Sequence, residues 1–204
     1  MARRLGDNAL ALAQYRAAAS AHPDNVSPRA ELALFLRELG YNAEAEETLH
    51  ACLSNLGCSL SLRSKLLVPL GCLLVERGER AAAIRCFSEA VSLTPSFRWA
   101  QLELARALRA EKEFSQSKAA YCAVLELSPA DLNALLGLGY IAREIGDRRE
   151  ALSRFHAAAE AHPLESLPRA EIAVELSAAG GFDKAARAYR ELLAEFPNHP
   201  WAWI

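Results

Sequence analysis

The sequence predicts an all-α protein, arranged as a stack of antiparallel helix pairs. A turn residue recurs with a period of about 34 residues, and one interval is longer than the others. Apolar residues between these markers follow helical spacing, and no segment alternates with period two, so no strands are expected. A constant period with two helices in each interval is typical of a repeat array. The markers are Pro23, Gly57, Pro95, Pro129, Pro163 and Pro197.

Other columns of residues agree inside the intervals. A glycine stands midway between successive markers, where it can adopt the left-handed conformation that ends one helix and turns the chain. The members of this column are Gly6, Gly40, Gly78, Lys112, Gly146 and Gly180. Small residues recur in the first half of the interval, where two helices approach closely: Ala33, Gly71, Ala105, Gly139 and Ala173. Large apolar residues recur in the second half: Tyr15, Leu49, Phe87, Tyr121, Phe155 and Tyr189.

We therefore expect one repeat domain over residues 1–204, with about five full repeats and partial repeats at both ends. Each full repeat has a first helix, such as Leu132–Ile145, and a second helix, such as Arg148–Ala161. Aspartates Asp7, Asp147 and Asp183 stand where the second helices start, as expected for N-caps. The expected helical units are approximately 1–25, 26–59, 60–97, 98–131, 132–165, 166–199 and a partial unit 200–204.

The unit over residues 60–97 departs from this pattern. It holds the four extra residues of the long interval, and Pro69 falls inside its first helix. A proline in a helix interior removes one backbone hydrogen bond and kinks the helix. We expect a longer first helix here, from about Leu60 to Arg77, bent at Pro69.

The sequence resembles the tetratricopeptide repeat family. The resemblance is carried by the segment Ala134–Tyr140, by Gly146–Ala151, and by Phe155, Ala158 and Pro163. It implies a right-handed superhelical solenoid whose first helices line a concave groove that binds peptides or partner proteins. The chaperone-binding members use a set of basic and amide residues in this groove. Leu34, Cys72 and Glu103 stand where such residues would be needed, so that carboxylate clamp is not expected.

The resemblance assigns one face of each first helix to the groove. In two successive repeats this face comprises Trp99, Leu102, Arg106 and Arg109, then Asn133, Leu136, Tyr140 and Arg143. Trp, Tyr and Arg often dominate binding energy at interfaces, and arginine pairs well with carboxylates. We therefore expect a protein or peptide partner with acidic character or a free C-terminal carboxylate. In the alternative interpretation, Trp99 packs under the preceding turn and the arginines are solvated.

Both ends of the chain look cut from a longer array. The residues before Gly6 read as the tail of a first helix whose beginning is absent. Solenoids normally end in a polar capping helix, whereas this chain ends in Trp201, Trp203 and Ile204. These three residues are candidates for self-association into a homo-oligomer.

The composition excludes several functions. A formal net charge of −2 argues against nucleic-acid binding, which needs an excess of Lys and Arg. No apolar run is long enough to insert into a membrane. Five scattered cysteines indicate a reducing, cytoplasmic location rather than a disulfide framework. No histidine or cysteine set has metal-ligand spacing, and no phosphate loop or nucleophile motif occurs, so neither cofactor, metal nor enzymatic activity is expected.

These observations favour a scaffold that binds a peptide or partner protein in a concave groove. Two alternatives remain open: a non-catalytic targeting or regulatory region of a longer enzyme, and a scaffold that assembles with itself through its C-terminal end.

Overall fold

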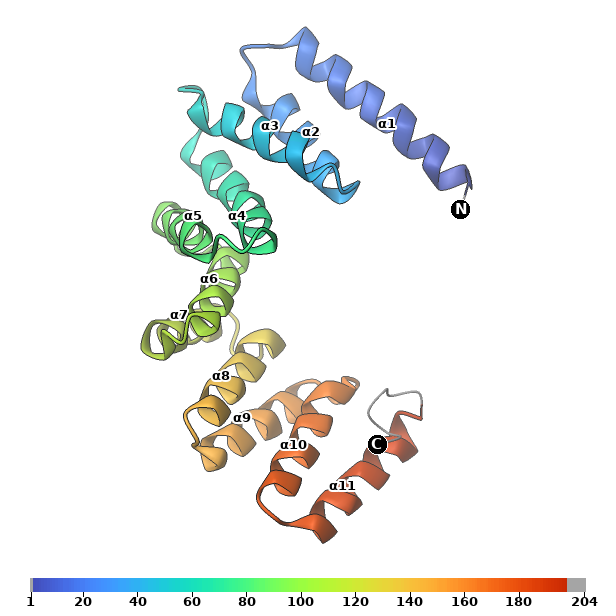
Figure 1. The fold of residues 1–204 in the computed structure, drawn as a ribbon, viewed down its shortest axis with the longest axis vertical. Helices are drawn as coiled ribbons and strands as arrows, with labels where there is room; N and C mark the ends of the chain where they lie inside the picture. The colour runs from blue at the N-terminus through green and yellow to red at the C-terminus, as the bar shows by residue number, and fades with distance from the viewer. Residues whose placement is uncertain (1, 198–204) are drawn as a thin grey trace. The chain divides into compact units, whose positions relative to one another are not determined.

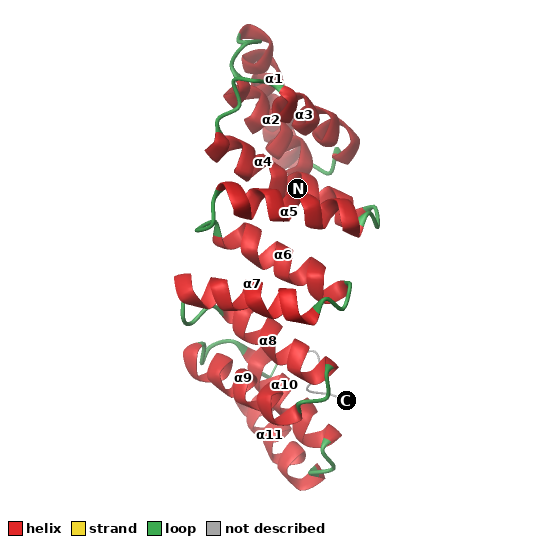
Figure 2. Ribbon diagram, turned by 90° about the vertical axis from the view of Figure 1, so that its left-hand side faces the viewer, coloured by secondary structure: helices red, strands yellow, loops and turns green. Residues whose placement is uncertain are grey.

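The computed structural model describes residues 2–197, with side chains from residue 7 onward. Within these residues the chain forms eleven α-helices and no strand, which confirms the all-α prediction (Figures 1 and 2). The helices are α1 (Ala2–Ala21), α2 (Val26–Glu38), α3 (Asn42–Ser54), α4 (Leu60–Glu76), α5 (Arg80–Leu93), α6 (Arg98–Ala110), α7 (Phe114–Leu127), α8 (Leu132–Glu144), α9 (Arg148–Ala161), α10 (Ser166–Ala178) and α11 (Phe182–Glu195).

The helices form two compact units, Met1–Ala107 and Leu108–Ile204, and α6 spans the boundary between them. In the first unit α2 packs against α3 and α4 against α5, and in the second α8 packs against α9 and α10 against α11. The first unit has its own apolar core, which includes Leu36, Leu49 and Phe87. In the second unit Phe155 is fully buried among side chains of α8, α9 and α10.

Glycines of the first helices let aromatic rings pack directly on the helix backbone. A Cβ added at Gly71 would lie 2.4 Å from Cε1 of Phe87, and one added at Gly139 would lie 2.4 Å from Cε1 of Phe155. Such distances are far inside van der Waals contact, so even alanine does not fit without movement. The small and large columns of the repeat therefore meet as partners in the pairs α4–α5 and α8–α9.

The left-handed turns between first and second helices fall where the glycine column predicts them. The glycines have φ of +80° (Gly40), +84° (Gly78), +87° (Gly146) and +76° (Gly180). Lys112, the one non-glycine member of the column, also has a positive φ of 62°. The turn therefore holds Lys112 in a left-handed conformation that is unfavourable for a residue with a side chain. The packing of the surrounding helices offsets this free-energy cost.

The prediction of a helix boundary at Gly6 was wrong, because α1 runs without interruption from Ala2 to Ala21. A glycine inside a helix costs only about 1 kcal/mol relative to alanine. A left-handed glycine is needed only where the chain reverses between two packed helices, and the chain does not reverse at this position. Asp7 consequently lies inside a helix rather than at its start.

Capping by aspartate is confirmed at one of the three predicted positions. Asp147 caps α9 by accepting a hydrogen bond from the backbone N–H of Glu150 at 3.0 Å. Asp183 instead lies in the first turn of α11, whose N-cap is Gly181. There the carboxylate still faces the positive end of the helix dipole.

The irregular repeat over residues 60–97 keeps Pro69 inside a long helix. α4 has 17 residues, whereas α2, α8 and α10 have 13 each, so the four extra residues of this interval lengthen the helix. It starts at Leu60 and ends at Glu76 with Arg77 as its C-cap, close to the predicted bounds, and Pro69 is buried within it.

The strained turn at Lys112 predicts opposite effects for two matched substitutions. Lys112→Gly should raise the free energy of unfolding by about 1 kcal/mol, because glycine adopts a positive φ without the steric penalty. Gly146→Ala should lower it by about as much, since no atom lies within 4 Å of the added methyl group and only the backbone penalty applies. Urea unfolding followed by circular dichroism measures both changes. A destabilising Lys112→Gly would show that the lysine side chain contributes more than its backbone costs.

The ring-on-glycine contact predicts a compensating pair of substitutions in the second unit. Gly139→Ala should destabilise the chain by about 1–3 kcal/mol, because the methyl group collides with the buried Phe155 ring. Adding Phe155→Leu should recover part of this loss, since leucine leaves room for alanine. Ala33 and Leu49 occupy these two columns in the first full repeat. A double-mutant cycle measures the coupling, and strictly additive losses would contradict the contact.

Candidate partner-binding surface

In the first unit, the candidate residues on α6 form a small polar cluster around Glu103. Trp99 is 40% exposed, and its indole Nε1 donates a hydrogen bond to Glu103 Oε1 at 3.1 Å. The Arg106 Nη1 group binds the same oxygen at 2.8 Å. The Trp99 ring also meets the edge of Phe97, with ring centroids 6.2 Å apart. Trp99 therefore packs partly on the preceding turn and still presents aromatic surface to a partner.

Cys72 of α4 lies in the electrostatic surroundings of this cluster. Burial raises the pKa of its thiol to about 11, and the nearby carboxylate of Glu103 contributes further. At neutral pH the group is a protonated thiol, which is a poor nucleophile and a poor metal ligand. Its role here is that of a small apolar side chain.

In the second unit, the candidate surface centres on the ring of Tyr140. The guanidinium carbons of Arg109 and Arg143 lie 5.1 Å and 5.6 Å from the centroid of this ring. The ring of Phe155 lies 5.6 Å away on the core side. Two arginines at such distances are attracted by the negative face of the aromatic ring. The surface thus unites three of the predicted residues from α6 and α8.

Two buried glutamates of α10 fix the positions of Tyr140 and Arg143. Tyr140 donates its hydroxyl to Glu171 Oε1 at 3.0 Å, and Arg143 Nη2 binds Glu171 Oε2 at 2.5 Å. Arg143 Nε also binds the carboxylate of Glu175. The two glutamates are only 4% and 2% exposed. Because buried carboxylates are stable only when paired, Arg143 is a structural partner of α10 as well as a surface residue.

The same network shifts two pKa values. Burial, followed by the charge and hydrogen bond of Glu171, raises the pKa of Tyr140 to about 12. Burial alone would lower the pKa of Arg143, but its hydrogen bonds to Glu171 and Glu175 outweigh this effect and raise it. At neutral pH the phenol is therefore a hydrogen-bond donor and the guanidinium remains a fixed positive charge.

Arg109 has a weaker and more accessible pairing. Its Nη1 binds Glu144 Oε1 at 2.6 Å, and the two side chains are 31% and 37% exposed. Its Nε is buried and has no hydrogen-bond partner among the described residues. An ion pair this exposed contributes at most about 1 kcal/mol, so a competing carboxylate can displace it.

The remaining candidates differ in their accessibility. Asn133 is exposed at the start of α8, as a contact residue requires. Leu102 and Leu136 are 7% and 5% exposed, so they belong to the helical core and offer a partner little surface. They were placed on the groove because helical spacing alone does not separate the edge of a core-facing stripe from the adjoining surface. Trp201, Trp203 and Ile204 lie outside the described residues.

Sequence reasoning missed the glutamates that pair with the candidate arginines. Glu171 and Glu175 lie one helical turn apart, at the positions occupied by Gly137 and Ile141 in the preceding repeat. Carboxylates at two core positions of one helix signal a buried basic partner, since an unpaired buried charge is too costly. That signal would have predicted a basic partner for α10, but not that Arg143 supplies it.

The described residues contain neither a cluster of metal-binding side chains nor a helix that could span a membrane. Over residues 2–197, no group of three or more His, Cys, Asp or Glu side chains is arranged to hold a metal ion. In the same part of the chain, every helix is too short or too polar to span a bilayer.

Comparison with known proteins places this fold among repeat proteins. Over residues 68–131 and 133–164 the sequence matches two family models, both described as tetratricopeptide repeat. Anaphase-promoting complex subunit 3 of Schizosaccharomyces pombe is 28% identical over 96 residues, which make up 47% of this chain and 14% of that protein. The chain therefore spans a small part of that relative's length.

Two solved structures illustrate the likeness of the fold. PilW, a type IV pilus biogenesis factor, superposes with a TM-score of 0.80 and 19% identity, covering 97% of this chain and 90% of that one. YrrB, described as a tetratricopeptide repeat protein with an unusual peptide-binding site, gives a TM-score of 0.71 and 17% identity, covering 93% and 95%. Both family-model matches follow the register of the marker prolines, and the helix pairs are those that this register predicts. Over the matched residues 68–131 and 133–164, the chain consists of tetratricopeptide repeats.

Proposed function

We propose that this chain is a non-catalytic scaffold that binds a partner polypeptide on the surface of its first helices. The tetratricopeptide repeat fold, which serves in protein–protein interaction, supports this role. The position of the binding site is inferred from the Tyr140 ring, which Arg109 and Arg143 flank. Tyr and Arg dominate the energetics of many interfaces. Trp99 and Arg106 would supply a second contact region in the first unit.

The two arginines of the second unit would have different tasks. Arg143 is held by two buried carboxylates and would position Tyr140 for contact with the partner. Arg109 is paired only with the accessible Glu144 and would exchange it for an acidic group of the partner. The partner would then be a peptide with an acidic side chain or a free C-terminal carboxylate, lying close to Tyr140 and the exposed Asn133.

The exchange at Arg109 predicts that removing its internal carboxylate strengthens binding. Peptides selected from a random display library on the wild-type chain serve as probes, and fluorescence anisotropy measures their affinity. Glu144→Gln should raise the affinity a few-fold, because Arg109 no longer has to break an internal pair. Arg109→Gln should lower it about tenfold, since a charge-assisted hydrogen bond is lost.

The matched control is Glu160→Gln, which makes the same charge change on the exposed face of α9. It should leave the affinity unchanged. Equal effects of Glu144→Gln and Glu160→Gln on the affinity would show that only the net charge of the chain matters, and would contradict a specific role of the Arg109–Glu144 pair. Unchanged binding by Arg109→Gln would place the binding site elsewhere.

A further inference from the structure

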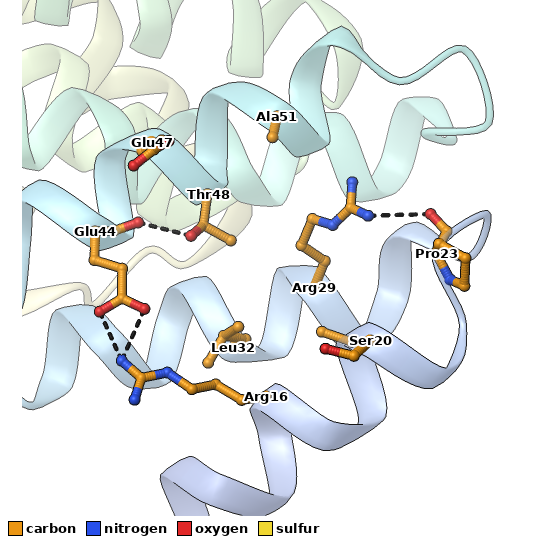
Figure 3. Close-up of a pocket in the computed structure, with 10 residues that line it drawn as sticks. Arg16, Ser20, Pro23, Arg29, Leu32, Glu44, Glu47, Thr48 and Ala51 are labelled. Atoms are coloured by element: carbon orange, nitrogen blue, oxygen red, sulfur yellow. Dashed lines mark hydrogen bonds and ion pairs between the residues drawn. The ribbon is translucent and has the colours of Figure 1, made fainter.

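A second groove lies in the first unit, between α1 and α3 and above α2 (Figure 3). Its volume is about 540 Å³, within the range of pockets that take small ligands or short peptide segments. Leu32 of α2 forms part of the floor, with Ala19 and Ala51 beside it. This groove is lined mainly by second helices and shares no residue with the surface around Tyr140.

The charges around this groove are only partly paired. Arg16 of α1 reaches across to the carboxylate of Glu44 on α3 at 2.8 Å (Figure 3). Arg29 Nη2 donates to the carbonyl oxygen of Pro23 at 3.1 Å, and this is a neutral acceptor. Within residues 7–197, neither Arg29 nor Glu47 takes part in an ion pair shorter than 4.0 Å. The groove therefore presents one cation and one anion outside ion pairs, Arg29 and Glu47, beside an apolar floor.

Other repeats show what the side chain at the position of Arg29 does. At the same place after the marker proline, Arg29, Gln101 and Arg169 each donate a hydrogen bond to that proline's carbonyl oxygen. This bond holds the turn between repeats, and a glutamine makes it as well as an arginine does. Arg169 has a further task, because it also pairs with Glu195 and lies 5.7 Å from the ring centroid of Phe196.

In the first full repeat the counterparts of this carboxylate and ring are missing. Asn55 and Leu56 stand directly before the marker, where the last repeat has Glu195 and Phe196. Helix α3 ends at Ser54, and the Asn55 side chain accepts a hydrogen bond from the N–H of Gly57. Leu56 is fully exposed. Arg29 thus makes the same hydrogen bond to the turn as Arg169 but lacks its acidic and aromatic partners.

We propose that the groove between α1 and α3 binds an acidic side chain of a partner peptide, whose carboxylate pairs with Arg29 as Glu195 pairs with Arg169. The residue that follows the acidic one packs against the apolar floor at Leu32. The pair of Arg169 with Glu195 indicates this occupant, because the partner restores at Arg29 the ion pair that the chain makes for itself in its last repeat. This second surface does not depend on the function proposed for the first helices.

The probe for this proposal is the tripeptide acetyl-Ala-Glu-Phe-amide, which copies Ala194–Phe196. It is titrated into the ¹⁵N-labelled chain, and the amide and arginine side-chain signals are followed by NMR. We expect saturable shifts centred on Arg29 and on neighbouring residues of α1 and α3. The R29Q variant should bind about tenfold more weakly, because glutamine keeps the bond to Pro23 but carries no charge.

Two matched controls test whether binding requires Arg29 itself and the charge of the peptide glutamate. R169Q makes the same change in the last repeat and should leave the shifts around Arg29 and their midpoint unchanged. The peptide acetyl-Ala-Gln-Phe-amide should bind about tenfold more weakly than its glutamate form, because it lacks the charge that pairs with the guanidinium. The proposal is overturned if no saturable shift occurs at α1–α3, if R29Q binds like the wild type, or if both peptides bind equally. Shifts confined to α8 and α10 would support the surface around Tyr140 and overturn this one.

Discussion

The close approach of the two helices in each repeat is the constraint on which the rest of the structure depends. Where Gly71 or Gly139 stands on the first helix, an aromatic ring of the second helix lies directly on the backbone. This contact fixes the separation of the two helices, since a closely packed ring cannot shift without leaving a void or a collision. The register of every other side chain follows from it. Residues on the opposite side of the first helix are then held outward at regular intervals.

The exposed side of the first helices is built from interactions between successive repeats. Arg143 of α8 binds Glu171 and Glu175 of α10, and Arg109 of α6 binds Glu144 of α8. Arg109 and Arg143 occupy the same position relative to the markers of their repeats, Pro129 and Pro163. Their surroundings differ because the acids that meet Arg143 are buried and the acid that meets Arg109 is accessible. One repeat position thus carries a structural arginine and, in the proposed function, a binding arginine.

Much of the fold could be predicted from the sequence, because the turn glycines and the small and large columns recur at one period. Even the positive φ of Lys112 follows from its place in the glycine column. The charge pairs could not be predicted in the same way. Which side chain of α10 meets α8 depends on how the two helices cross, and a single period does not encode that angle. The exposure of Leu102 and Leu136 was misjudged for the same reason.

The central claim is that Arg109 and Arg143 occupy one repeat position but have different roles. Urea unfolding of Arg109→Gln and Arg143→Gln at neutral pH tests it most directly. Arg143→Gln should lower the free energy of unfolding by about 3 kcal/mol or more, because it leaves two buried carboxylates without a cation. Arg109→Gln should lower it by less than about 1 kcal/mol, as expected for an exposed pair. Equal losses in the two variants would contradict the account.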